Sequence, residues 1–140
     1  MDAFDADALI YAAQPRHPLG RRVRALLAPT YRELDESDAV GSVVLLPELM
    51  AKPMRAGDGT QLAALAAVLA RLELLPADEE VAMLAASVGA KHRLRAADAL
   101  HLATAISAGA DRFITNNSAD LPRSIPEIDI TYPADLADPG

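Results

Sequence analysis

Cysteine is absent from this 140-residue sequence, so it cannot form disulfides, thiolate metal sites or a cysteine nucleophile. Aromatic residues make up only 4%, which argues against a surface of stacked bases. The longest apolar run, residues 62–70, covers less than half of the roughly 20 residues that a transmembrane helix needs. With no signal peptide evident, we therefore expect a cytoplasmic protein without a membrane segment.

The formal net charge of −7 disfavours a protein that coats nucleic acid, because phosphate binding normally uses clustered lysine and arginine. A nuclease remains compatible with this charge, since carboxylates that bind metal add negative charge to the protein. Arg21, Arg22 and Arg24 are basic residues that could guide a phosphate chain. A solvated helix face is the favoured interpretation of these arginines.

Aliphatic residues dominate a hydrophobic fraction of 51%, and strand patterns alternate with helix patterns along the whole chain. The alternation predicts one α/β domain with a mostly parallel central sheet flanked by helices. A polar loop is expected around residues 29–38, and residues 133–140 read as a polar C-terminal tail. The expected strands are residues 2–5, 39–44, 72–75, 112–115 and 128–132, and the expected helices are residues 8–13, 19–27, 46–53, 60–71, 79–92 and 96–108.

Acidic residues stand near strand exits and in one apolar helix. Asp5 ends the first strand, where it is either a site residue or a helix N-cap. Glu48 follows the second strand, and its structural alternative is stabilisation by the helix dipole together with a pair to Lys52. Asp98 interrupts an almost wholly apolar helix, a placement that charged residues avoid unless they are paired or bind metal. His101, three residues later, is either a ligand or, as we favour, a packed and hydrogen-bonded histidine.

Three carboxylates on separate elements predict an oxygen-ligand site, because ligands bind at the carboxyl ends of strands in parallel sheets. Mg²⁺ or Mn²⁺ suits such a site better than Zn²⁺, which prefers histidine and cysteine. A cation there could activate water towards a phosphodiester. We therefore expect Asp5, Glu48 and Asp98 to lie close together.

These residues resemble the PIN-domain family, especially its VapC-type toxins, over nearly the whole chain. The first block is residues 4–12, the second is residues 42–49 with Glu48, and the third is residues 94–104 with its Asp-Ala-Leu-His-Leu-Ala-Thr run. The third block is the most specific. In the fourth block, Asn117 stands where many members carry Asp, and Asp120 matches the acidic residue of an alternative version.

The resemblance implies a metal-dependent endoribonuclease, usually a homodimer, that a small cognate antitoxin neutralises by covering the acidic pocket. It implies that Asp5 and Asp98 bind the metal and that Glu48 binds metal or orients the attacking water. Thr115 would hydrogen-bond the phosphate or a neighbouring ligand. Either Asp120 or Asn117 would complete a second metal position.

Two other functions compete with this hypothesis. A haloacid-dehalogenase-like phosphatase would use Asp5 as nucleophile, Asp7 as acid and Thr115 as phosphate ligand, but the chain lacks a later acidic pair and a matching lysine. A catalytically inactive PIN-like interaction module is favoured by Asn117 and the acidic balance. For the homodimer, an apolar stripe on one expected helix offers a surface, and it comprises Leu62, Leu65, Val68 and Leu69.

Overall fold

Five short parallel strands form the centre of the structure, a computed structural model that describes residues 1–27 and 38–140. The sheet order is β3-β2-β1-β4-β5, and every neighbouring pair is parallel. The predicted parallel α/β architecture is therefore confirmed. The strands are β1 (Asp2–Phe4), β2 (Ala39–Ser42), β3 (Glu73–Leu75), β4 (Arg112–Ile114) and β5 (Asp129–Thr131).

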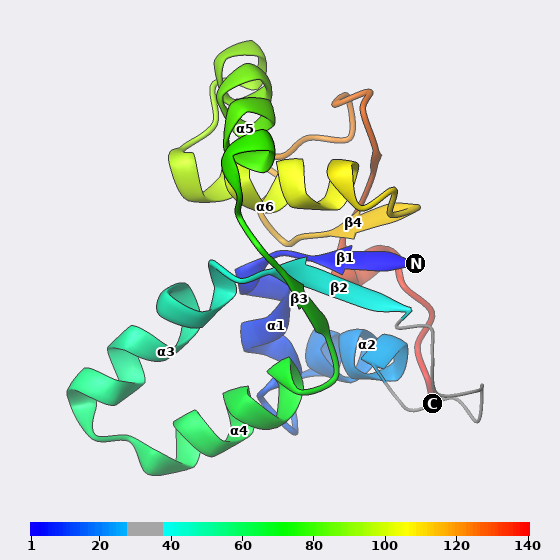
Figure 1. Cartoon of the computed structure of the whole chain (residues 1–140). Helices are drawn as coiled ribbons and strands as arrows, with labels where there is room; N and C mark the ends of the chain where they lie inside the picture. The colour runs from blue at the N-terminus through cyan, green and yellow to red at the C-terminus, as the bar shows by residue number, and fades with distance from the viewer. Residues whose placement is uncertain (28–37) are drawn as a thin grey trace.

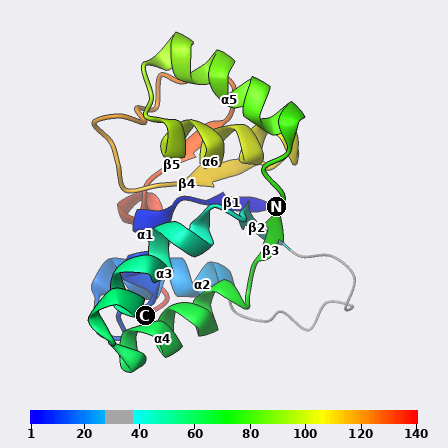
Figure 2. The ribbon, with the colours of Figure 1, turned by 60° about the vertical axis from the view of Figure 1, so that its left-hand side comes forward.

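Helices cover both faces of this sheet, with α1 to α4 on one side and α5 and α6 on the other (Figures 1 and 2). Parallel strands need crossover connections. Helices lie in each of them except the one from β4 to β5, where residues 115–128 form turns and bends. The helices are α1 (Ala6–Ala12), α2 (Pro18–Leu27), α3 (Leu45–Ala56), α4 (Gly59–Leu69), α5 (Glu79–His92) and α6 (Ala96–Ser107), with a 3₁₀ turn, η1, at Pro133–Asp135.

Alternation along each strand divides the core between the two faces. Phe4 and Ile114 pack with α1 to α4, whereas their neighbours Ala3 and Phe113 pack with α5 and α6. Successive side chains of a strand point to opposite faces, so each strand supplies both cores. Most other core residues are aliphatic, as the composition indicated. In the described part of the chain, no helix has both the length and the apolarity needed to cross a bilayer.

Local signals set the helix ends. The Asp58 side chain accepts a hydrogen bond of 3.0 Å from the Gln61 backbone N–H and caps α4. Asp78 caps α5 in the same way, with 2.9 Å to the Val81 N–H. Gly57 ends α3 with a φ of 66°, a left-handed conformation that favours glycine.

Two details differ from expectation. Pro53 does not interrupt α3, which continues to Ala56. The proline lies in the last turn, where its missing N–H removes one intrahelical bond, and its ring is buried. The residues expected as a polar tail pack in part on the domain, since Leu136 is 6% exposed. The loop expected around residues 29–38 falls almost wholly outside the described residues.

Two of the arginines of α2, Arg22 and Arg24, are hydrogen-bonded within the domain, and Arg21 is exposed. Arg22 donates from Nη1 to the carbonyls of Ala134 and Leu136, each at 3.0 Å. Arg24 donates to the carbonyl of Ala12 at the end of α1 and to those of Gln14 and Pro15 in the turn that follows. These arginines therefore hold the C-terminal segment and that turn against α2.

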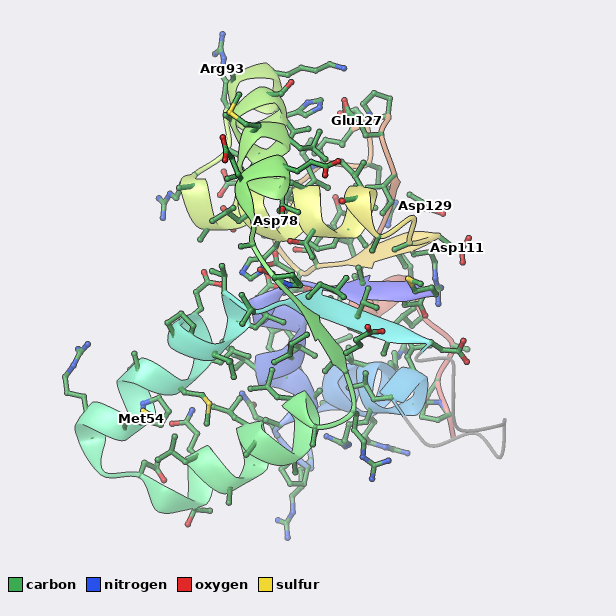
Figure 3. All side chains as sticks on the ribbon, viewed as in Figure 1. Met54, Asp78, Arg93, Asp111, Glu127 and Asp129 are labelled. Carbon is green, nitrogen blue, oxygen red and sulfur yellow. The ribbon has the colours of Figure 1, made fainter. Side chains whose placement is uncertain are left out.

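The stripe expected to mediate dimerisation is used within the domain. Leu65, Val68 and Leu69 are 8% exposed or less and belong to the core shared with α1 and α3, and Leu62 is half-buried. Because Leu65, Val68 and Leu69 pack in the core, most of the stripe is not available to a second copy. A large exposed apolar side chain lies elsewhere, near the end of α3, where Met54 is 60% exposed (Figure 3).

Candidate active site

Asp5 leaves β1 at the carboxyl edge of the sheet and is only 4% exposed. Its Oδ1 accepts a hydrogen bond of 2.8 Å from the Ala6 backbone N–H, so it caps α1. Its Oδ2 accepts a second, also 2.8 Å, from the Thr115 hydroxyl. The two interpretations of Asp5 are therefore compatible, because one carboxylate caps the helix and lines a pocket.

Thr115 follows β4, the strand beside β1, and is fully buried. Its Oγ1 donates to Asp5 and accepts a 3.1 Å hydrogen bond from the Asn117 backbone N–H. A fully buried hydroxyl with these partners orients a neighbouring carboxylate. The resemblance implied that Thr115 hydrogen-bonds the phosphate or a neighbouring ligand, and in the structure it contacts Asp5, a candidate ligand.

Glu48 stands in the first turn of α3, and its side chain is 32% exposed. Its carboxylate pairs with the His101 ring through Oε2 and Nε2, not with Lys52. His101 is 2% exposed, so the favoured interpretation of a packed, hydrogen-bonded histidine matches the structure.

Asp98 is half-buried in the first turn of α6. It shares with Asp5 and Glu48 a pocket of about 460 Å³ at the carboxyl edge of the sheet. The fold thus brings together three side chains that are far apart in sequence. The pocket is lined by Asp5, Ala6, Asp7, Ile10, Glu48, Leu49, Asp98, Asn116 and Asn117.

Burial and mutual repulsion raise the pKa values of three carboxyl groups of the acidic pocket, those of Asp5, Asp7 and Asp98. Burial and the charge of Asp7 raise the pKa of Asp5 to about 6. Burial also raises the pKa of Asp7. For Asp98 burial is again the main cause of a raised pKa, and the charges of Glu48 and Asp120 add to it. A cation in the pocket would oppose all these shifts, because opposite charge favours the ionised carboxylate.

The donors present fit a hard divalent cation, since the lining offers carboxylate and amide oxygens without sulfur. Within residues 1–27 and 38–140, no three acidic or histidine side chains stand close enough to surround an ion directly. Asp5 is held by Ala6 and Thr115, and Glu48 is drawn towards His101. Mg²⁺ usually retains several waters and takes only one or two carboxylates directly, so this spacing suits a partly hydrated ion.

Asn117 and Asp120, the alternatives for the fourth position, are bonded to each other. The Asn117 Nδ2 donates to Asp120 Oδ2 at 3.1 Å, and the Asp120 N–H donates to Asn117 Oδ1 at 3.2 Å. Asn117 lines the acidic pocket, whereas Asp120 is exposed at its rim and acts electrostatically on Asp98. The two side chains therefore form one unit beside the pocket.

Asp7 and Asn116 also line the pocket. From the sequence, Asp7 was considered only as the acid of the phosphatase alternative, and Asn116 was not considered. Asp7 Oδ1 accepts a 3.0 Å hydrogen bond from the Asn116 backbone N–H, and Asn116 Nδ2 donates to the Tyr11 hydroxyl at 3.0 Å. The dipole of α1 explains an acidic first turn without any function, which is why Asp7 did not stand out. Its spacing of two residues from Asp5 was the available signal.

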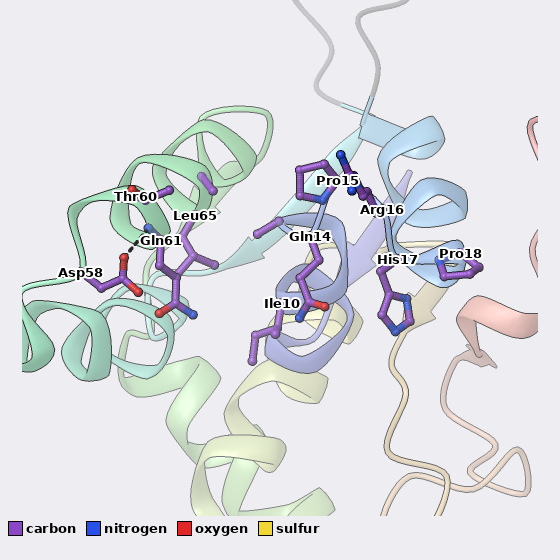
Figure 4. Close-up of a pocket in the computed structure, with 12 residues that line it drawn as sticks. Ile10, Gln14, Pro15, Arg16, His17, Pro18, Asp58, Thr60, Gln61 and Leu65 are labelled. Atoms are coloured by element: carbon purple, nitrogen blue, oxygen red, sulfur yellow. Dashed lines mark hydrogen bonds between the residues drawn. The ribbon is translucent and has the colours of Figure 1, made fainter.

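A larger hollow of about 850 Å³ lies between α4 and the segment that joins α1 to α2 (Figure 4). Its lining is mostly apolar and includes His17 and Leu65, with Asp58 as its carboxylate. Ile10 lines both hollows. The smaller hollow is lined by four carboxylates, whereas Asp58 is the carboxylate of the larger one.

Fold and pocket together define a parallel α/β domain with an acidic pocket at the carboxyl edge of its sheet. Residues 3–123 match the PIN domain family, and the chain belongs to that family. No curated protein matches the sequence at a significant level.

Several solved structures share the fold. A chain of a toxin–antitoxin complex from Klebsiella pneumoniae is 20% identical with a TM-score of 0.71, covering 97% of this chain and 100% of its own. A chain of DNA-bound VapBC from Salmonella typhimurium is 22% identical with a TM-score of 0.72, covering 94% and 97%. A chain of FitAcB from Neisseria gonorrhoeae is 22% identical with a TM-score of 0.70, covering 97% and 100%.

Proposed function

We propose that this chain is a cytoplasmic, metal-dependent endoribonuclease that hydrolyses RNA phosphodiester bonds with Mg²⁺ or Mn²⁺. The observation that carries the proposal is the single acidic pocket in which Asp5, Glu48 and Asp98 meet at the carboxyl edge of the sheet. Membership of the PIN domain family supports a nuclease. The absence of lysine from the pocket lining disfavours the phosphatase alternative.

Asp5 and Asp98 are the proposed metal ligands. Thr115 and the Ala6 N–H hold the Asp5 carboxylate in one orientation, so little conformational entropy is lost when a ligand binds. Glu48 binds the metal or orients the attacking water. Asn117 and Asp120 supply the fourth position, with Asn117 at the pocket and Asp120 at the rim.

A divalent cation, when bound, polarises the phosphodiester and lowers the pKa of a water. The chain's own residues then have two tasks. Glu48 accepts a hydrogen bond from the water and so aligns its lone pair with phosphorus. Asp5 and Asp98 remain ionised beside the cation and fix its place against the substrate, so positioning accounts for much of the rate.

The partners proposed are an RNA substrate, a small cognate antitoxin protein and a second copy of this chain. The structures that share its fold include those described as toxin–antitoxin complexes, which supports the antitoxin. Homodimerisation rests on the family alone, since the α4 stripe is internal. A short reading frame immediately upstream whose product co-purifies with this chain would support the toxin role.

The test is metal-dependent cleavage of a panel of structured RNAs by the purified protein. Asp98→Asn should abolish the Mn²⁺-stimulated cleavage and leave the fold intact, because asparagine keeps the volume and loses the charge that anchors the cation. Asp111→Asn is the matched control, since Asp111 precedes β4 at the opposite edge of the sheet (Figure 3). Wild-type cleavage by Asp98→Asn would refute the mechanism. A wild-type protein that binds a partner but cleaves none of these RNAs would favour the inactive interaction module.

A further inference from the structure

His101 lies in the middle of α6 and joins the two layers of the domain. Its ring Nε2 is hydrogen-bonded to Glu48 Oε2, 53 residues away in sequence. The two helices belong to different cores, because α3 packs with α1 and α4 while α6 packs with α5. This hydrogen bond therefore crosses the carboxyl edge of the sheet, beside the acidic pocket.

The direction of this hydrogen bond follows from the chemistry of its partners. An ionised carboxylate only accepts, so the Nε2–H of His101 is the donor whether the ring is neutral or charged. The other ring nitrogen, Nδ1, is buried and has no hydrogen-bond partner among the described residues. A flipped ring would place a carbon against Glu48 and lose the bond, so the ring has one productive orientation.

A side chain with only a packing role would not need these nitrogens. The ring lies on an apolar helix next to Leu100 and Leu102, and burial of an unsatisfied nitrogen costs stability that a leucine would avoid. What the histidine supplies is a rigid, buried donor aimed at one carboxylate. Glu48 needs such a donor because its flexible side chain is 32% exposed at the rim of the pocket.

We propose that His101 is a positioning residue that holds the Glu48 carboxylate at the acidic pocket for the cation and water bound there. The proposal rests on the proposed function. His101 itself is not a ligand, because Nε2 is committed to Glu48, Nδ1 is buried, and the ring does not line the pocket. A hydrogen bond of this kind orients a carboxylate that binds metal or water and restricts its rotamers before the ligand arrives.

The experiment compares three substitutions of His101 by Mn²⁺ binding in isothermal titration calorimetry and by RNA cleavage. His101→Leu removes the donor, and we expect Mn²⁺ to bind about 10- to 100-fold more weakly. His101→Gln places an amide N–H close to the original Nε2 and should retain most of the affinity. His101→Asn carries the same amide one methylene shorter and should behave as His101→Leu does. Thermal unfolding of each variant shows that it is folded.

A double-mutant cycle separates positioning from general stability. If His101 acts through Glu48, then His101→Leu in the Glu48→Ala background should cause no further loss of Mn²⁺ affinity. Additive losses, or wild-type Mn²⁺ affinity in His101→Leu, would overturn the inference while the proposed function stands. A wild-type protein that binds no Mn²⁺ would overturn the proposed function.

The hydrogen bond itself is tested without metal by nitrogen NMR of the ¹⁵N-histidine-labelled full chain. We expect a protonated Nε2 on His101 in the wild type and a clear change in its resonance in Glu48→Ala. This measurement needs no His101 variant, so it decides the point even where His101→Leu fails to fold. An unprotonated Nε2 would refute the positioning role. A His101 Nε2 resonance that does not change in Glu48→Ala would refute it as well.

Discussion

Replacement of Asp5 by asparagine should make the metal-free protein more stable at neutral pH while removing its capacity to respond to metal. Asp5 is 4% exposed, and burial together with the charge of Asp7 raises its pKa to about 6, from the usual 3.8. The ionised form is therefore disfavoured in the folded state. Asparagine has nearly the same volume and caps helices as well as aspartate does, so the cap on α1 should survive.

The magnitude follows from proton linkage. One pKa unit corresponds to 1.36 kcal/mol, so the rise from 3.8 to about 6 corresponds to a penalty of about 3 kcal/mol for ionised Asp5. The Asp5→Asn variant avoids this ionisation penalty, but its amide nitrogen replaces the oxygen that accepts the hydrogen bond from Thr115. The lost hydrogen bond costs about 1 kcal/mol. The net stabilisation expected above pH 6 is thus about 1–3 kcal/mol.

The raised pKa of Asp5 also determines how the stability difference between wild type and Asp5→Asn changes with pH. Below about pH 3.8 Asp5 is protonated in both folded and unfolded states, so ionisation carries no penalty. As pH rises from 3.8 through about 6, the unfolded state ionises first and wild-type stability falls relative to that of the variant. The advantage of Asp5→Asn should therefore be small near pH 4 and full at pH 7.5.

The assay is urea unfolding in EDTA at pH 4 and pH 7.5, followed by thermal unfolding with and without Mn²⁺. Mn²⁺ should raise the melting temperature of the wild type by preferential binding to the folded state, and Asp5→Asn should lose this response. Asp58→Asn is the matched control, because Asp58 caps α4 from an exposed position. A less stable Asp5→Asn at pH 7.5, or an equal difference at both pH values, would refute the reasoning.

Three further substitutions test the stability of the fold outside the pocket. Arg93 ends α5 with a φ of 57°, a strained left-handed conformation, so Arg93→Gly should stabilise the fold by about 1 kcal/mol. Gly57→Ala at the end of α3 should destabilise the fold by about as much. Urea unfolding measures both changes, and a destabilised Arg93→Gly would contradict the inferred backbone strain. Burial raises the pKa of Glu127, but hydrogen bonds of 2.8 Å from Lys91 and His92 outweigh it and lower the pKa to about 2. The Glu127 carboxylate stabilises the fold above about pH 4.5, and this stabilisation is lost as the pH falls towards 2. Glu127→Gln should therefore reduce the loss of unfolding free energy between about pH 4.5 and pH 2. An unchanged loss in the variant would exclude the contacts of Glu127 with Lys91 and His92 as its source.

Local patterns in the sequence were enough to predict the architecture and much of the pocket. The alternation of strands and helices predicted the parallel sheet, and Asp58 and Asp78 marked the start of helices that the structure confirms. Asp5 and Glu48 follow β1 and β2, and residues leaving parallel strands meet at one edge of the sheet. Asp98 lines the same pocket from the first turn of α6. These features depend on periodicity and on short-range capping, which a single sequence displays directly.

Contacts between distant segments depended on tertiary structure. Arg22 binds carbonyls of the C-terminal segment over 100 residues away, so a basic helix face became a structural clamp. From the sequence, Leu65 could have faced a second copy or the sheet. In the structure it packs in the core on one face of the sheet. For Glu48 the sequence suggested only a pair with the nearby Lys52, and nothing in it indicated the distant His101. Chain folding placed His101 against Glu48, because α3 and α6 approach each other only across the edge of the assembled sheet.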